Sequence, residues 1–569
     1  MHTMTSPDLV QKLPFLRIFQ PCSQHLPAHE QATISNQRAK HILNAYALTE
    51  DDIKSLSQKF WRMHIDPITC LDGAATTLLT IQANLAAGTL AAHVDDQPCH
   101  RGLLEQMLRF EVSGQFCLTE ADHGLDAINI ETVATSLVDG GFELHTPHAG
   151  AAKFMPPTYP CGIPCFAIVF ARFMSQGNFC GIKPFVVQLS DGTEMCPGIT
   201  IRVLPPRRSA SHVQHCLTYF DRVRLPQSAM LGQVAQLDYR LDFLQSIWRV
   251  AAGSLGLGSI AIPALQIAAF IAGKYSQRRT ISQAGTGVER IPLITFKTQH
   301  APILIALCQS FVLKELWKFA TTFFSDDSHD PRVRHGVAAV FKAIAVQHSQ
   351  AAHLKLSERC GAQGLFDYNQ ICTQHAEMRG IAIAEGDLLG LSIRLASELV
   401  LGRYELPVSS QPDALLAQHD SGLLSSCRQT LLRVGNHRSA EFSRELLPCA
   451  EKIVQSIGHR MAYDAAVEAR LDRRILDLYL WSTVRLDEAW YSENLRISTA
   501  AQSVAEDTAL EAALPLLDDW MSDTRVEPYI FAPIVSTERW DGFLAGLYTV
   551  SGTRVREENL QRRTRTARL

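Results

Sequence analysis

The chain has 569 residues, enough for several domains and a large core. Hydrophobic residues make up 46% of it and charged residues 19%, a balance that is typical of globular proteins and excludes a largely disordered chain. A formal net charge of −4 argues against nucleic acid as the main partner, because nucleic-acid-binding proteins usually carry a basic face.

Residue patterns along the chain predict an α+β fold with four regions. We expect an N-terminal helical domain at 1–111, a central β-rich domain of antiparallel strands at 112–232, a helical bundle at 233–405 and a C-terminal helical domain at 406–569. The strands are short runs separated by Asp-Gly steps at Asp139-Gly140 and Asp191-Gly192, which suit hairpin turns.

The stretch from Val250 to Gly273 contains no charge and is long enough to span a bilayer. We interpret it as a buried helix of a soluble bundle, because nothing else in the chain resembles a second span. The first twenty residues lack a basic segment followed by a long apolar run, so no secretory signal is expected. The 14 Cys show no zinc-like spacing and are interpreted as free thiols in a reducing compartment, with a zinc site as the weaker alternative.

Two motifs offer hydrogen-bond donors to a ligand. Thr119-Glu120 ends a strand and leads into a polar loop with His123-Gly124. A hydroxyl and backbone N–H groups there can bind the edge of a planar ring, and an ordinary capping Thr is the alternative. Arg278 and Thr280, in YSQRRT, close the uncharged helix, where the arginines either bind phosphate or favour the helix dipole.

Two later motifs lie around long helices. Gly361 and Gly364, in CGAQG, form a helix C-cap or let the backbone approach a pyrophosphate. Glu385 follows an apolar run and precedes Asp387, the expected N-cap of an amphipathic helix. Desolvation in an apolar pocket raises the pKa of a carboxyl and makes it a base near neutral pH, while a Glu that favours the helix dipole is the alternative.

Together and in this order, the motifs resemble those of the acyl-CoA oxidase and acyl-CoA dehydrogenase superfamily, from about residue 100 to 405. The chain looks like a divergent, fungal-type peroxisomal acyl-CoA oxidase. Three further segments carry the resemblance. LHTPHAGAAKFMPP, ending at Pro157, is similar to the family's Lys-Trp-Trp-Pro-Gly segment, YFDRVRLP to its Phe-Asp-x-Val-Arg-Ile-Pro, and ITFKTQHAPIL to its Gln-bearing helix.

The resemblance implies FAD as the cofactor, acyl-CoA as the substrate, O₂ as the electron acceptor giving H₂O₂, and a homodimer, with no metal, nucleic acid or membrane. It makes Glu385 the base that removes the α-proton on the way to a trans-2-enoyl-CoA. The implied FAD-binding residues are Thr119 at the flavin ring, Gly124 and Pro157 in the segments beside it, Gly361, Gln363 and Gly364 along the pyrophosphate, Asp387 nearby, and Arg278, Thr280 and Gln299 from the neighbouring subunit.

The sequence departs from the family's pattern at Leu125, Met155, Pro157, Ala362, Ala384 and Leu388. These departures favour an unusual acyl group and leave two alternatives open: an acyl-CoA dehydrogenase-like desaturase of a secondary-metabolite pathway, and a catalytically degenerate family member. The chain ends in Ala567-Arg568-Leu569, a variant of the Ser-Lys-Leu peroxisomal address. We therefore expect a peroxisomal location, with the cytoplasm as the alternative.

Overall fold

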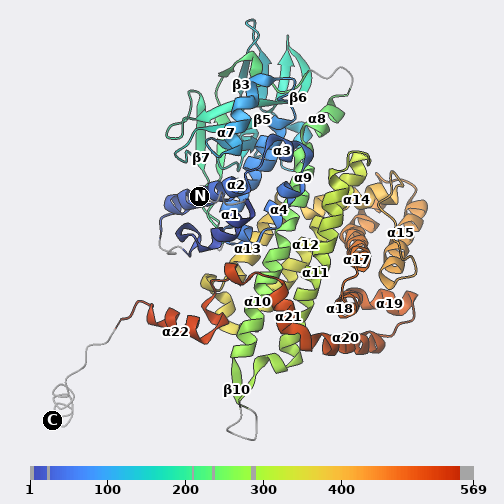
Figure 1. Ribbon diagram of the computed structural model, residues 1–569. Coiled ribbons are helices and arrows are strands. Elements are labelled where there is room, and N and C mark those ends of the chain that lie inside the picture. Colours follow the sequence, from blue (N-terminus) through green and yellow to red (C-terminus); the bar gives the residue numbers. More distant parts are fainter. Residues whose placement is uncertain (1–5, 22–25, 208–209, 234–237, 283–289, 551–569) are drawn as a thin grey trace, which may run out of the picture.

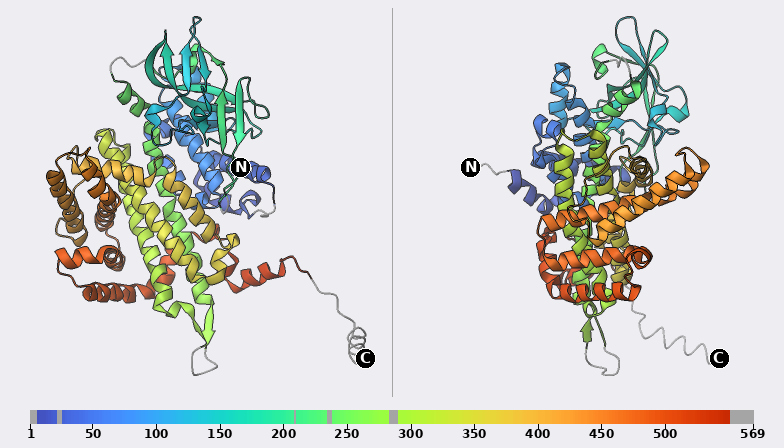
Figure 2. Two further views of the ribbon diagram at one scale, coloured as in Figure 1. Left: turned by 180° about the vertical axis from the view of Figure 1, so that it is seen from behind. Right: turned by 90° about the vertical axis from the view of Figure 1, so that its right-hand side faces the viewer.

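The computed structural model describes residues 6–21, 26–207, 210–233, 238–282 and 290–550. A β domain lies at one end of the molecule, helices from the first hundred residues lie beneath it, and a bundle of long helices runs to the opposite end (Figure 1). The last helices wrap one side of this bundle, as the views from behind and from the side also show (Figure 2). The predicted order of helical, β and helical regions is confirmed.

The N-terminal helices are α1 (Ser6–Lys12), α2 (Ala28–Tyr46), α3 (Glu50–Ser55), α4 (Gln58–Ile65), α5 (Gly73–Thr80), α6 (Ala87–Ala91) and α7 (Arg101–Leu108). Between α5 and α6 the chain forms a π-helical turn, η4 (Ile81–Ala86), so residues 73–91 are one helical run with a wide turn inside it. Such π-turns are rare and often lie at functional sites.

The β domain contains β1 (Ser113–Cys117), β2 (Val133–Ser136), β3 (Phe142–His145), β4 (Lys153–Phe154), β5 (Cys165–Ser175), β6 (Asn178–Ser190), β7 (Ile199–Val203), β8 (Cys216–Phe220) and β9 (Val223–Leu225). One sheet has the order β1-β5-β2-β3-β9 with β6 also on β5, and a second has the order β4-β8-β7.

The expectation of a purely antiparallel domain is wrong, because β1 and β2 both run parallel to β5 and the main sheet is mixed. The expected hairpin across Asp139-Gly140-Gly141 is present, since β2 and β3 pair antiparallel on either side of it. The parallel pairs join strands that are distant in the sequence, and turn residues carry no information about such pairs.

The bundle contains α8 (Tyr239–Ser246), α9 (Trp248–Ser259), α10 (Ala261–Arg278), α11 (Lys297–Ser325), α12 (Pro331–Arg359), α13 (Ile371–Ile383) and α14 (Leu388–Val400), with the hairpin β10 (Thr280–Ser282) and β11 (Arg290–Pro292) at its far tip. Within the described residues, the run Tyr239–Arg278 is long and apolar enough to cross a membrane by length and composition, and its most apolar window is entirely buried inside the fold.

The C-terminal helices are α15 (Leu415–Val434), α16 (Ala440–Glu445), α17 (Ala450–Glu468), α18 (Arg473–Val484), α19 (Glu488–Asn494), α20 (Thr499–Ala513), α21 (Leu517–Asp523) and α22 (Thr537–Ala545). Of these, α15, α17, α18, α20 and α21 pack on α11, α12 or α14. One apolar core is continuous from the N-terminal helices through the bundle to these helices, whereas the β domain has a smaller core of its own.

Candidate active site

Glu385 lies in the short link between α13 and α14, where the sequence predicted a loop. Its φ of +53° is in the left-handed region, which costs a non-glycine residue about 1–2 kcal/mol. Gly386 follows with a φ of +102°, and the Asp387 carboxylate accepts a hydrogen bond from the Gly390 N–H at 2.9 Å. Asp387 is therefore the N-cap of α14, as predicted.

Side chains from two bundle helices bind the backbone of this link. Lys342 of α12 is fully buried, and its Nζ donates to the carbonyl oxygens of Ala384 at 2.5 Å and Gly386 at 2.6 Å. Ser254 of α9 donates its hydroxyl to the Glu385 carbonyl. Three consecutive carbonyl groups are thus held from inside the bundle.

The Glu385 carboxylate points inward although the residue as a whole is only half-buried. Asn84, in the π-helical turn η4, donates its Nδ2 to Glu385 Oε2 at 3.3 Å and to the Arg249 carbonyl at 2.9 Å. Gly253 of α9 makes room for the carboxylate, since a Cβ there would lie 1.1 Å from Glu385 Oε2. The carboxylate is seated between α9 and η4.

Arg249 supplies a second buried cation beside this seat. Its Nε donates to the Asn84 carbonyl and its Nη1 to the Ile53 carbonyl, both at 3.0 Å, while its Nη2 has no hydrogen-bond partner among the described residues. Burial lowers the pKa of Arg249 to about 10, so the group stays charged at neutral pH. Its charge favours the ionised form of Glu385.

Burial raises the pKa of Glu385 to about 8, against the opposing effects of the Lys342 and Arg249 charges and the Asn84 hydrogen bond. Burial also lowers the pKa of Lys342 to about 8, while the charges of Glu385 and Asp387 act in the other direction. A base works best when its pKa lies near the operating pH. Glu385 therefore has the environment of a general base.

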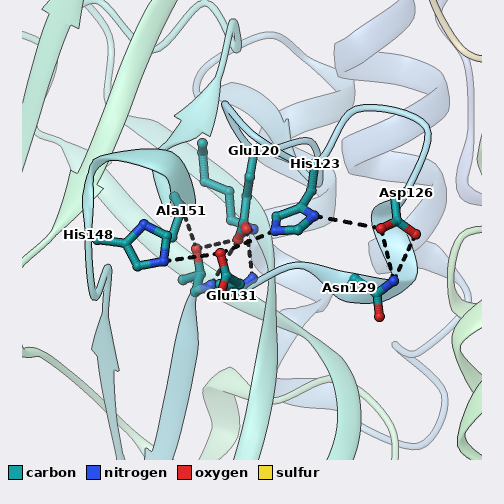
Figure 3. A network of polar contacts seen from close by, with 9 residues as sticks. Glu120, His123, Asp126, Asn129, Glu131, His148 and Ala151 are labelled. Carbon is teal, nitrogen blue, oxygen red and sulfur yellow. Dashed lines mark hydrogen bonds and ion pairs between the residues drawn. The ribbon is translucent and has the colours of Figure 1, made fainter.

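The loop after β1 is fixed by a buried ion pair between Glu120 and Lys153, both fully buried, with Lys153 Nζ 2.9 Å from Glu120 Oε1. Thr132 donates its N–H and its hydroxyl to the same oxygen, at 2.9 and 2.7 Å. Burial alone would raise the pKa of Glu120, but the Lys153 charge and these hydrogen bonds bring it below its usual value. Around this pair, the rings of His123 and His148 both approach Glu131 (Figure 3).

This anchor sets the position of Thr119, the residue that the resemblance places at the flavin ring. The Thr119 carbonyl accepts from the Phe154 N–H at 2.9 Å, which joins the loop to β4. The Thr119 side chain is half-buried, and its hydroxyl makes no hydrogen bond to any described residue. A free hydroxyl at a strand end remains available to a ligand.

The Thr119 loop and the Glu385 link meet at the junction of the three parts of the fold. Leu125 packs on the first turn of α14, with its Cδ1 3.3 Å from where a Gly390 Cβ would be. From the other side, the Gly114 N–H of β1 donates to Gln82 Oε1 of η4 at 2.5 Å, two residues before Asn84. Segments around Asn84, the loop after β1 and the Glu385 link are therefore neighbours.

Exposed apolar side chains surround this junction. Leu125 is 76% exposed, Ile383 67%, Leu389 49% and Met155 39%, and Gly124 lies in open space. Exposed apolar side chains are candidates for contact with an apolar ligand. The free Thr119 hydroxyl adds a polar group in the same loop as Leu125. Pro157, in contrast, is buried by protein atoms alone and offers little surface to a cofactor.

The remaining predicted residues gather at the far end of the bundle. Gln299 of α11 donates to Ser276 Oγ and to the Arg359 carbonyl, each at 2.8 Å, and so joins the ends of α10 and α12. Arg278 donates to the Ile534 carbonyl at 3.1 Å, and Thr280 accepts from Arg290 at 2.8 Å.

Gly361, Gln363 and Gly364 follow α12 in a 3₁₀ turn at this same end. A Cβ on Gly364 would lie 2.0 Å from the Ser357 carbonyl oxygen, so packing within the chain already requires this glycine. Gly361 has a φ of +59° and nothing within 4 Å of an added Cβ. The exposed glycine, Gly361, is the one with free space for a phosphate.

Sequence reasoning missed the residues that hold Glu385 and its link: Asn84, Arg249, Gly253, Ser254 and Lys342. Lys342 left a signal, since it is the only charge in the apolar run from Val337 to Val346. A lone lysine there requires an internal partner, because an unpaired buried charge is costly. Asn84 left no comparable signal.

The chain is similar to acyl-CoA oxidases in sequence. It is 26% identical over 304 residues to the human peroxisomal acyl-coenzyme A oxidase 3, covering 48% of this chain and 43% of that protein. It is 21% identical over 432 residues to acyl-coenzyme A oxidase acox-3 of Caenorhabditis elegans, covering 71% and 64%. The chain spans about half the length of the curated relatives it matches. No family model matches it.

Solved structures share the whole fold. Acyl-CoA oxidase 3 of Yarrowia lipolytica matches with a TM-score of 0.80 at 15% identity, over 99% of this chain and 92% of that one. Acyl-CoA oxidase-2 of Caenorhabditis elegans, solved with FAD, ascaroside-CoA and ATP, also has a TM-score of 0.80 at 15% identity, over 99% and 94%.

The helical, β, helical arrangement is thus the acyl-CoA oxidase fold. The sequence similarity and the shared fold both support the acyl-CoA oxidase and acyl-CoA dehydrogenase superfamily.

Proposed function

We propose that the chain is an FAD-dependent acyl-CoA oxidase that converts an acyl-CoA into a trans-2-enoyl-CoA and passes the electrons to O₂, giving H₂O₂. The observation that carries the proposal is the inward carboxylate of Glu385, seated between α9 and η4 at the junction where the Thr119 loop and an apolar rim converge. The relatives that bear the name acyl-CoA oxidase support the same reaction.

The cofactor assignment follows from the groups available at the junction. Thr119 would hydrogen-bond the flavin, and Met155 and Leu125 would cover apolar ring surface. When bound, FAD supplies the redox chemistry, accepting a hydride from the substrate β-carbon and reacting with O₂. Neighbouring structures that contain FAD support this assignment.

In the proposed mechanism, Glu385 takes the α-proton onto a carboxylate oxygen. Burial holds the pKa of this carboxyl at about 8, so the group binds the proton strongly enough to remove it from carbon yet is substantially ionised in mildly alkaline solution. Asn84 and Gly253 fix the direction of the carboxylate.

We also propose a homodimer, and the length of the bundle supports it. Arg278 comes 24 residues after Ser254 along α9 and α10, which is about 36 Å at 1.5 Å per residue. Residues at both ends can contribute to one cofactor only if they come from different subunits. Leu365 and Phe366, 78% and 48% exposed beside Gly361, are apolar surface that a second subunit would cover.

We propose a peroxisomal location because three relatives are named peroxisomal and the chain ends in Ala567-Arg568-Leu569. This tail lies outside the described residues. A fluorescent fusion with the tail intact should co-localise with a peroxisomal marker and lose that location when the last three residues are removed.

The test is to compare wild-type protein with Glu385→Gln. Both should carry bound flavin, and turnover should fall by about 10²–10⁴-fold in the variant, the usual contribution of a general base. Glu377→Gln, another buried carboxyl with a raised pKa, is the matched control and should keep its activity.

The readouts are the flavin absorbance and H₂O₂ release with a panel of acyl-CoAs. Retained turnover in Glu385→Gln excludes this residue as the base. Anaerobic flavin reduction without H₂O₂ release in air would favour the desaturase alternative, and a purified protein without flavin would favour the degenerate family member.

A further inference from the structure

We infer that Lys342 is a positioning residue for Glu385, which it holds in a reactive orientation by binding the carbonyl groups on both sides of it. The inference rests on the proposed function for its catalytic meaning. The contacts themselves are independent of any substrate.

The geometry of the link requires such a device. Glu385 adopts a left-handed φ of +53° that a non-glycine residue leaves readily when nothing holds it. The carbonyl groups of Ala384 and Gly386, the residues before and after Glu385, both turn inward, where the buried Nζ of Lys342 binds them at 2.5 and 2.6 Å. One side chain therefore fixes the peptide unit before Glu385 and the one after Gly386, and so constrains the unit between them.

The neighbouring helix completes the hold. Ser254 binds the carbonyl of Glu385 itself, and the adjacent Gly253 leaves space for the carboxylate. Contacts from α12 and α9 thus fix the backbone around Glu385, while Gly253 and Asn84 fix the orientation of its side chain. A base held within a fraction of an ångström is worth more than the same carboxylate on a mobile loop.

Lys342 also acts through its charge. The charged groups that face Glu385 are Lys342 from α12 and Arg249 from α9, with Asp387 on its own link and the neutral Asn84 from η4. Among the described residues Lys342 Nζ bonds to two carbonyl oxygens and forms no ion pair, while the charges of Glu385 and Asp387 act on it from nearby. Removing this cation removes one of the two charges that favour ionised Glu385.

Three variants separate geometry from charge. Lys342→Met removes both, Lys342→Arg keeps the charge on a different shape, and Ser254→Ala removes one carbonyl contact without changing any charge. Lys183→Met, a lysine of β6 that is 3% exposed and contacts a carbonyl and a carboxylate elsewhere, is the matched control.

The first measurement is amide hydrogen exchange of residues 384–390 in the flavin-loaded protein without substrate. Exchange should be at least about tenfold faster in Lys342→Met, measurably faster in Ser254→Ala, and unchanged in the control. Wild-type exchange rates in Lys342→Met would overturn the inference. Should Lys342→Met fail to fold, unchanged exchange in both Ser254→Ala and Lys342→Arg would overturn it.

The second measurement is the pH profile of kcat/KM with an acyl-CoA. For Lys342→Met, kcat should fall by about 10- to 100-fold with KM within about threefold, and the acid limb should move to higher pH because the lost cation no longer stabilises ionised Glu385. Ser254→Ala should lower kcat without shifting the acid limb of the pH profile. Lys342→Arg, which keeps the charge, should also leave the acid limb at the wild-type pH.

An unmoved limb in Lys342→Met would overturn the electrostatic part of the inference, and a fall in kcat confined to unfolded or flavin-free variants would overturn the positioning part. If the wild-type protein oxidises no acyl-CoA, the proposed function fails, while the exchange measurement still decides whether Lys342 holds the link.

Discussion

Gly253→Ala tests whether the seat of the carboxylate controls the reaction. A Cβ at this residue would lie 1.1 Å from Glu385 Oε2 and 2.7 Å from Asn84 Nδ2, whereas ordinary contact begins at 3.4 Å. The carboxylate must therefore move by roughly 2 Å. Because a misplacement of about 1 Å costs about 10²-fold in rate, kcat/KM should fall at least ~100-fold, equivalent to about 2.7 kcal/mol.

The same substitution should leave the protein folded. The clashing atoms are the ends of flexible side chains, and Ala is favoured over Gly inside a helix by up to ~1 kcal/mol. The assay is steady-state kcat/KM at matched flavin content, with thermal unfolding to verify the fold. Gly102→Ala in α7, where an added Cβ meets nothing within 4 Å, is the control. Activity of Gly253→Ala within threefold of wild type would refute the reasoning.

Three further predictions concern stability and pH. Lys153→Met leaves the buried Glu120 carboxylate unpaired and should lower the free energy of unfolding by about 3–5 kcal/mol in urea titrations. The control Lys318→Met removes an ion pair at the surface and should change the free energy of unfolding by less than about 1 kcal/mol. Equal losses in the two variants would contradict this prediction. The kcat/KM of the wild-type enzyme should rise with pH and level off above about 8, because Glu385 must be unprotonated to act, and a flat profile between pH 6 and 9 would contradict its role. His348 and His459 are buried with ring centroids 5.1 Å apart, and burial lowers the pKa of His348 to about 4 and that of His459 further. Since only the unfolded chain binds these protons between about pH 6.5 and 4, stability should fall as the pH drops through that window, and His348→Phe should reduce the slope of the urea midpoint against pH.

The sequence predicted the parts of the fold that depend on local patterns. The alternation of helical and β regions, the hairpin at Asp139-Gly140 and the N-cap at Asp387 all follow from periodicity and turn chemistry, and all are present. Glu385 could be located for the same reason, because an acidic residue between an apolar run and a capped helix is a local sequence pattern.

The parts that escaped prediction depend on contacts between distant segments. The parallel pairing of β1 and β2 with β5 joins strands up to about fifty residues apart, and no local signal specifies it. Asn84 reaches Glu385 across 301 residues, from a wide turn that propensity does not reveal. The roles of individual residues in binding FAD stay predictions.

The left-handed backbone of Glu385 has a consequence for how this chain can change over time. Glycine and asparagine occupy that conformation more readily than glutamate, so replacing Glu385 by either would relieve backbone strain while deleting the carboxylate that we propose as the base. Selection for a sturdier protein and selection for turnover therefore act in opposite directions at this single residue. A lineage released from the demand for catalysis should lose its glutamate early and gain thermal stability as it does so.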